Sequence, residues 1–398
     1  MKDNVFDFTS KDSDLKTKKL NKTRIVLIII LFILISSVVA LLIVYNKNTD
    51  FREFWDYTVL RKEVESADVK SIELKKENLS FSYSYDRKIA ILEKNILKCY
   101  NSEANVETQF ELNVANPTYY SSGKFLVVAE KSGGKVYLIN ENNMMWQKDL
   151  EGTISQVYVN KNGYVGVAMS TTGYKTVIIL YTQTGEELFR TFLPTTYCTN
   201  MDISSDNKTM AIAELDTSGT MIETVIKVIS IEKAKTEPKS AFLGTYNAGS
   251  NNMVLNLKYT DSGRLVVAYD NAVYYAGENM EKILDISSDT MFVDIGSNNR
   301  VISIKKQNAN LLNISYVLNI YNTNSEKNIE YNLKDAPKAL YVRENVIVVG
   351  YGTDVEIINA QSGWLIKKYV SRQDIKNVLI ANGFVGIEYA EQVKLVKI

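Results

Sequence analysis

One short pattern recurs along most of this chain: a tight turn, then an apolar strand that ends in a small residue. Tight hairpins need a residue that tolerates a positive φ angle, and Gly and Asn do so most readily. Aligned on the turn, eight copies place that position at Arg87, Gly123, Gly163, Asn207, Gly263, Asn299, Asn345 and Gly383. The pattern therefore predicts a series of β-hairpins.

The distance between turns matches the length of a propeller blade. Successive turns lie 36, 40, 44, 56, 36, 46 and 38 residues apart, and a four-stranded blade has about 40–45 residues. Within one copy, TISQVYV, YVGVAMS, TVIILYT and ELFRTFL read as four successive strands. The longest interval contains an insertion around Glu232 to Asn252. We predict an all-β, eight-bladed β-propeller over residues 69–398. Seven blades are the alternative if the weak first copy is an N-terminal extension, and two separate β domains come third.

The two ends of this domain are expected to close the ring together. The last copy supplies three strands and then stops one strand short. VKSIEL, at Val69 to Leu74, is the segment that can provide the missing strand. Such closure leaves no open sheet edge, which would otherwise favour aggregation.

A run of twenty residues from Ile25 to Val44 has no charge, proline or glycine. At about 1.5 Å per residue it spans a bilayer core of roughly 30 Å. We therefore predict a transmembrane helix at residues 25–45, in contact with the lipid bilayer. A cleaved signal peptide is the competing interpretation, but its apolar stretch is usually shorter and is followed by a small-residue cleavage site.

Charges flanking this run predict its orientation. Residues 1–24 contain seven Lys or Arg, whereas only Lys47 and Arg52 follow closely on the other side. Because positive flanks remain in the cytoplasm, residues 1–24 form a cytoplasmic disordered tail in this interpretation. The domain at residues 69–398 is then extracytoplasmic, on a single-pass protein of the cell membrane.

Residues 46–68 form a predicted amphipathic helix or linker beside the membrane. Its apolar residues have helical spacing, and Trp and Tyr favour the headgroup level of a bilayer. The alternative is that this stripe packs on the underside of the propeller. The predicted membrane-interface residues are Phe51, Phe54, Trp55 and Tyr57.

The repeats resemble those of quinoprotein-like and WD-like propellers, in which a turn is followed by a Trp. Trp146 occupies that place in one copy, whereas Leu188, Ile329 and Ile366 occupy it in others. With its basic tail and single apolar helix, the whole chain resembles a family of membrane-anchored propellers from low-GC Gram-positive bacteria. Because only one Trp is kept, the resemblance to quinoprotein-like propellers supports the fold more than a cofactor.

Several kinds of chemistry are excluded or disfavoured by composition. The chain has no histidine, which excludes a Ser-His-Asp triad and a His-ligated zinc. Charges are balanced, so we expect no nucleic-acid partner. Cys99 and Cys198 have no short-spaced framework, and we expect both to be buried and free. We predict no catalytic, metal or cofactor-binding residues and no cofactor.

Asp202 and Asp294 are the candidates for a carboxylate pair, because both lie in predicted first strands near the mouth of the ring. A glycoside hydrolase needs only two suitably spaced acids. The alternative, which we favour, is that each carboxylate accepts hydrogen bonds from its neighbouring turn.

The hypothesis that follows is a non-catalytic scaffold that binds an envelope protein at the outer face of the membrane. A receptor for a cell-wall glycan or small ligand, bound in the central channel or on one loop face, is the second hypothesis. A carboxylate-dependent wall hydrolase is the third. The sequence does not indicate an oligomeric state.

Overall fold

The computed structural model describes residues 22–47, 51–52, 54–60, 69–75, 80–247, 252–277, 280–296, 298–310 and 313–398. The chain divides into two compact units, residues 1–55 and 56–398. The first contains the helix α1 (Lys22–Lys47). Its segment Val26–Tyr45 is long and apolar enough to cross a membrane, with a mean hydropathy of 3.4. Membrane anchors and signal sequences share these properties.

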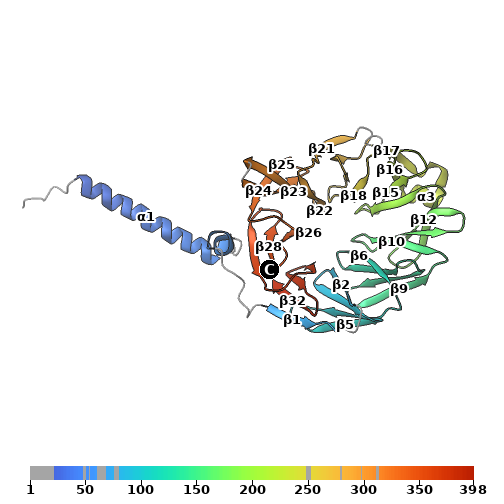
Figure 1. The fold of residues 1–398 in the computed structure, drawn as a ribbon, viewed down its shortest axis with the longest axis horizontal. Coiled ribbons are helices and arrows are strands. Elements are labelled where there is room, and N and C mark those ends of the chain that lie inside the picture. Colours follow the sequence, from blue (N-terminus) through green and yellow to red (C-terminus); the bar gives the residue numbers. More distant parts are fainter. Residues whose placement is uncertain are drawn as a thin grey trace, which may run out of the picture. The chain divides into compact units, whose positions relative to one another are not determined.

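In the described part of the second unit, the strands form eight four-stranded antiparallel sheets, so the predicted eight-bladed propeller is confirmed. Each blade is a meander whose first strand lies nearest the centre of the ring (Figure 1). The first four blades are β2 (Ser80–Tyr85), β3 (Lys88–Glu93), β4 (Ile96–Tyr100), β5 (Val106–Glu111); β6 (Pro117–Ser122), β7 (Phe125–Glu130), β8 (Lys135–Asn140), β9 (Asn143–Asp149); β10 (Thr153–Val159), β11 (Val165–Thr171), β12 (Tyr174–Tyr181), β13 (Glu187–Leu193); and β14 (Tyr197–Ile203), β15 (Thr209–Asp216), β16 (Glu223–Ser230), β17 (Phe242–Tyr246).

The other four blades complete the ring. They are β18 (Val254–Tyr259), β19 (Leu265–Tyr269), β20 (Ala272–Tyr275), β21 (Glu281–Asp285); β22 (Thr290–Gly296), β23 (Arg300–Asn310), β24 (Asn313–Asn322), β25 (Lys327–Leu333); β26 (Ala339–Arg343), β27 (Val346–Gly350), β28 (Asp354–Asn359), β29 (Leu365–Val370); and β30 (Asn377–Ala381), β31 (Phe384–Glu388), β32 (Gln392–Lys397), β1 (Val69–Glu73).

The predicted closure of the ring is confirmed. Strand β1 pairs antiparallel with β32, from Val69 opposite Val396 to Glu73 opposite Gln392. Residues from the two ends of the domain therefore complete one blade (Figure 1). The insertion predicted around Glu232 to Asn252 contains a short helix, α3 (Ile231–Thr236), and a 3-10 turn, η3 (Pro238–Ser240). It also includes β17, which is the regular fourth strand of its blade, so only part of this segment is additional to the blade.

The turns between first and second strands adopt positive φ angles at six of the eight predicted positions. The prediction was wrong by one residue in two copies. There the positive φ belongs to Asp86 (44°) and Glu344 (49°), each one residue before the expected position. Both turns contain two residues, and the alignment selected the second instead of the first.

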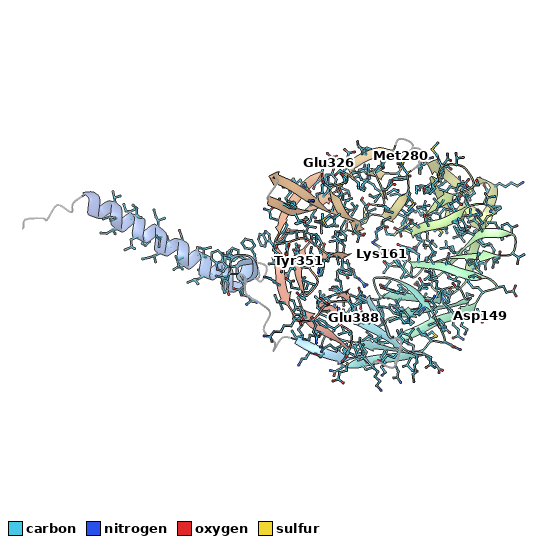
Figure 2. The ribbon with its side chains drawn as sticks, viewed as in Figure 1. Asp149, Lys161, Met280, Glu326, Tyr351 and Glu388 are labelled. Atoms are coloured by element: carbon cyan, nitrogen blue, oxygen red, sulfur yellow. The ribbon has the colours of Figure 1, made fainter. Side chains whose placement is uncertain are left out.

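The core lies between blades. Second strands are the most deeply buried, as in FLVVA of β7, where five successive residues are buried. Val127 of β7 and Val167 of β11 belong to one apolar cluster that joins two consecutive blades. Cys99 and Cys198 are both buried and free, as predicted, and they lie in different blades, on β4 and β14. Figure 2 shows how the side chains fill the ring between the sheets.

Candidate functional site

A cavity of about 630 Å³ lies at the centre of the ring and is lined by residues from the first strands of all eight blades. Its lining reaches the turns that join first to second strands, including Gly123 and Asp261. Because each blade is an antiparallel meander, these turns share one face of the ring with the turns between third and fourth strands. We call this the hairpin face. The opposite side, the crossover face, carries the loops between second and third strands and the connections between blades.

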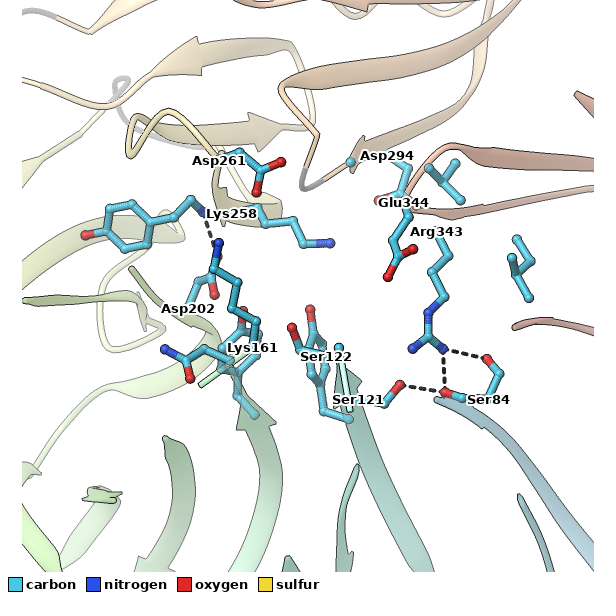
Figure 3. A pocket seen from close by; sticks show the side chains of 18 of the residues that line it. Ser84, Ser121, Ser122, Lys161, Asp202, Lys258, Asp261, Asp294, Arg343 and Glu344 are labelled. Carbon is cyan, nitrogen blue, oxygen red and sulfur yellow. Dashed lines mark hydrogen bonds between the residues drawn. The ribbon is translucent and has the colours of Figure 1, made fainter. Parts of the chain in front are cut away.

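Six lining residues occupy the same register in six blades. They are Tyr120, Tyr158, Asp202, Lys258, Asp294 and Tyr341. Their partners in the second strands are, in the same order, Val127, Gly166, Ala211, Val266, Ile302 and Val348. The repeat therefore brings polar side chains that are far apart in sequence into one cavity (Figure 3).

Asp202, on β14, is buried and connects two blades. One carboxylate oxygen accepts a hydrogen bond from its neighbour Ile203 N at 2.8 Å, and the other accepts from Tyr259 N on β18 of the next blade at 2.6 Å. The second contact corrects the prediction, because that partner belongs to a neighbouring strand and not to a turn. Burial raises the pKa of Asp202 to about 7, although both hydrogen bonds favour the ionised form.

Asp294, on β22, lies two blades further round the ring. It accepts from Ile295 N at 2.7 Å and from the Asn256 side chain at 3.0 Å, so it too bonds a first strand of another blade. Burial raises its pKa, and the charge of Lys258 acts in the opposite direction. Lys258 belongs to the intervening blade, and its ammonium group donates to the Ile295 carbonyl at 3.3 Å.

Arg343, at the end of β26, supplies a second cation to the cavity. Its Nη1 donates to the Ser84 carbonyl at 2.5 Å and to the Ser84 hydroxyl at 2.9 Å. Its Nη2 is buried and has no hydrogen-bond partner among the described residues. Burial lowers the pKa of this guanidinium, but an arginine remains protonated at neutral pH.

The aromatic part of the lining comes mainly from β6 and β10. The rings of Tyr120 and Tyr158 lie 4.3 Å apart, and that of Tyr119 lies 4.0 Å from the ring of Tyr83. Tyr119 is 42% exposed. The cavity thus combines aromatic surface, hydroxyl groups and charges of both signs.

No group of three or more His, Cys, Asp or Glu side chains arranged to hold a metal ion occurs among the described residues. The chain also lacks histidine altogether. The groups available for chemistry at the ring centre are therefore carboxyl, ammonium, guanidinium, phenol and hydroxyl groups.

The crossover face carries most of the large apolar side chains that are exposed on the ring. They occur on loops and strand ends of four consecutive blades, and their exposed fractions lie between 38% and 57%. They are Tyr174, Phe192, Tyr197, Met221, Ile222, Met253, Leu255, Met291 and Ile314. A surface of this kind typically marks a site of protein–protein contact.

The structure describes the side chains of three of the four predicted membrane-interface residues: Phe51, Phe54 and Trp55. Residues 54–59 form a π-helical turn, η1 (Phe54–Val59). The Phe51 ring lies 5.9 Å from the Trp55 ring and 6.4 Å from the Phe54 ring, so these three side chains form a cluster. The Tyr57 side chain and residues 61–68 lie outside the described residues.

Sequence reasoning identified Asp202 and Asp294 but missed Lys258, Arg343 and the tyrosines of the cavity. A signal for two of them was present. Tyr158 and Lys258 stand five residues before the turn position of their copies, as the two aspartates do. Arg343 gave no such signal, because its role depends on a contact with Ser84, 259 residues away in the chain.

The fold is similar to several solved propellers, each with little sequence identity. The C-terminal WD40 domain of Sif2 has a TM-score of 0.57 and 15% identity, with 82% of this chain and 98% of that chain covered. Saccharomyces cerevisiae Sqt1 has a TM-score of 0.54 and 12% identity, with the same coverage. Chaetomium thermophilum Sqt1, bound to the N-terminus of ribosomal protein L10, has a TM-score of 0.50 and 9% identity over 81% of this chain and all of the other.

No curated protein matches the chain. A family model does match, over residues 60–397, which include the whole ring. The chain belongs to the family of unknown function DUF5711.

Proposed function

We propose that this protein is a non-catalytic scaffold: a membrane-anchored propeller that binds another envelope protein at the outer face of the cell membrane. The apolar surface on the crossover face is the observation that carries this proposal. It is rich in Tyr, Phe and Met, the residue types that are enriched in protein interfaces. A rigid ring also presents such a surface without a large ordering cost on binding.

The helix α1 supports the membrane part of the proposal. Its apolar segment has the length of one bilayer crossing, and the Lys and Arg residues before it favour a cytoplasmic N-terminus. In this proposal residues 25–45 span the bilayer. Phe51, Phe54, Trp55 and Tyr57 lie at the headgroup level beyond it.

Similar propellers lend support through what they bind. The Sqt1 structure from Chaetomium thermophilum holds the N-terminus of a ribosomal protein. A ring of this architecture can thus recognise a segment of another protein. Our proposal extends that kind of recognition to an envelope protein.

Site-specific crosslinking tests the binding face. A photoreactive amino acid placed at Ile222 or Leu255 should capture a specific partner in intact cells. The same group at Phe242 or Trp364, which are exposed to a similar degree near the hairpin-face ends of their strands, should not. Equal capture from both faces, or background alone from the crossover face, would contradict the proposal.

A topology experiment tests the location separately. The two native cysteines are buried, so a Trp364→Cys variant provides one exposed thiol on the ring. We expect a membrane-impermeant maleimide to label this variant in intact cells, while the unchanged protein stays unlabelled. Labelling of the variant only after lysis would place the ring in the cytoplasm.

The central cavity favours a second candidate function, that of a small-ligand receptor, because it is lined by charges and aromatic rings. The hydrolase hypothesis has less support. Both oxygens of Asp202 already accept hydrogen bonds from backbone N–H groups, which is the arrangement of a structural carboxyl that joins two blades.

A further inference from the structure

The cavity has one polar group whose bonding is incomplete. Arg343 uses Nη1 for Ser84, but its buried Nη2 has no partner among the described residues. A buried donor without a partner costs free energy, of the order of 1–3 kcal/mol. Guanidinium groups bind carboxylates through two adjacent N–H groups, so an oxyanion beside Arg343 would satisfy this donor.

Two cations, Lys258 and Arg343, line the interior of the cavity. Lys258 extends from β18 into the cavity, and Arg343 projects toward the centre from another side (Figure 3). Asp202 and Asp294, which face Lys258 from the two adjacent blades, have raised pKa values because they are buried. Near neutral pH Asp202 is therefore only partly ionised.

The remaining charged residues of the lining lie at its rim. Lys161, Asp261 and Glu344 belong to the turns of the hairpin face or directly precede them. Lys161 is positive, whereas Asp261 and Glu344 are negative, so the rim carries a net negative charge. The cations of the interior are Arg343 and Lys258.

The other side chains of the cavity wall indicate which further chemical groups a ligand would have. Tyr119, Tyr120 and Tyr158 supply flat aromatic surface, and Ser121 and Ser122 supply hydroxyl groups on the same side. Aromatic faces suit the apolar side of a ring, whereas hydroxyls and carboxyls suit its substituents. The volume of about 630 Å³ falls within the usual range of small-molecule sites.

We propose that the central cavity binds an acidic saccharide: a hydroxylated ring that bears a carboxylate. The carboxylate lies between Arg343 and Lys258, and the ring packs against Tyr119 and Tyr120. This inference does not depend on the protein-binding proposal, because it concerns the cavity and not the crossover face.

Calorimetric titration of the full-length protein in detergent tests it with matched sugar pairs. The acidic probes are glucuronate, galacturonate and N-acetylmuramate, and their neutral partners are glucose, galactose and N-acetylglucosamine. We expect at least one acidic sugar to bind about tenfold or more tightly than its neutral partner, since charge-assisted hydrogen bonds are the strong ones. Glucose 6-phosphate separates a carboxylate site from a phosphate site.

Two variants on separate strands keep the test decisive. Arg343→Gln and Lys258→Met should each weaken binding of the acidic sugar about tenfold or more, whereas Arg372→Gln, at an exposed arginine, should leave it unchanged. Circular dichroism checks that each variant remains folded. If one cavity variant does not fold, the other supplies the test.

Three outcomes would overturn the proposal. One is that no acidic sugar binds. Another is equal binding of acidic and neutral sugars, or binding of glucose 6-phosphate alone. The third is unchanged affinity in a folded cavity variant.

Discussion

The indole ring of Trp146 packs on Gly185 of the next blade so closely that a Cβ atom on Gly185 would lie 3.0 Å from the indole Cγ. Trp146 belongs to the outer strand β9, and Gly185 lies in the turn before β13. Ile329 and Gly363 make the same contact two blades before the end of the ring, where a Cβ on Gly363 would overlap the isoleucine side chain. The side chain at the Trp position of one blade is thus held by a glycine turn of the next.

Replacing Gly185 by alanine should therefore lower the unfolding free energy by more than the strain of its positive φ angle alone. Gly185 has a φ of 84° and Gly173 a φ of 87°, but nothing lies within 4 Å of a Cβ at Gly173. We expect Gly173→Ala to cost about 1 kcal/mol of unfolding free energy from strain, and Gly185→Ala to cost about 1–3 kcal/mol more from crowding against Trp146. Urea unfolding of the full-length protein in detergent measures both. Equal losses would mean that the indole moves aside freely.

The strand that closes the ring offers a second prediction. Ile72 of β1 is only 5% exposed and packs in the cluster shared with β31 and β32. Ile72→Ala should lower the unfolding free energy by about 2–4 kcal/mol. Ser71→Ala, at the adjacent exposed position of the same strand, should change it by less than about 0.5 kcal/mol. If Ile72→Ala is as stable as Ser71→Ala, then β1 contributes little to closure.

Stability should fall as the pH rises through neutrality. Burial raises the pKa of Asp202 to about 7, above the value of about 3.9 for an exposed aspartate. The folded state therefore holds this proton more tightly than the unfolded chain does. The resulting stabilisation is complete below about pH 4 and is lost as the pH passes through about 7. Asp294 acts in the same direction.

Asp202→Asn isolates this effect, because an amide cannot ionise. We expect the variant to be less stable than the natural protein at pH 5, since the amide cannot accept both backbone hydrogen bonds. Its urea midpoint should nevertheless change less between pH 5 and pH 8. Asp374→Asn, at an exposed aspartate, is the control. An unchanged pH dependence in Asp202→Asn would show that Asp202 is already ionised at pH 5.

Neither cysteine should react while the protein is folded. Burial raises the pKa of the Cys198 thiol to about 12, and it also raises the pKa of Cys99. The thiolate is the reactive form, and both sulfur atoms are covered. A chromogenic disulfide reagent should therefore titrate no thiol in the native protein and both in denaturant. Rapid native reaction would reveal an opening of the blade that contains the thiol.

The repeat in the sequence predicts the propeller architecture. Gly or Asn at the turns and apolar second strands are local properties, and they repeat at the length of a blade. Counting these segments favoured eight blades over seven and predicted a closing strand at Val69 to Leu74, where the structure has β1 (Val69–Glu73). The errors at Asp86 and Glu344 arose because a two-residue turn can place its positive φ on either residue.

The cavity could be anticipated only in part. Asp202 and Asp294 were predicted because an acidic residue is unusual in an otherwise apolar first strand. Their hydrogen bonds to residues of other blades were not predicted. The hydrogen bond from Arg343 to Ser84 joins residues 259 positions apart, and no local pattern encodes such a pair. Chemistry at the ring centre arises from closure, which brings the first strands of all eight blades around one axis.

The sequence by itself thus predicted the blades and the apolar helix and favoured eight blades over seven, because hairpin turns and hydrophobic periodicity depend on near neighbours in the chain. Only the tertiary structure decided which side chains share the cavity, which donor lacks a partner and which face carries the exposed apolar surface. Those properties depend on burial and on distances between blades, and they exist only once the ring has closed.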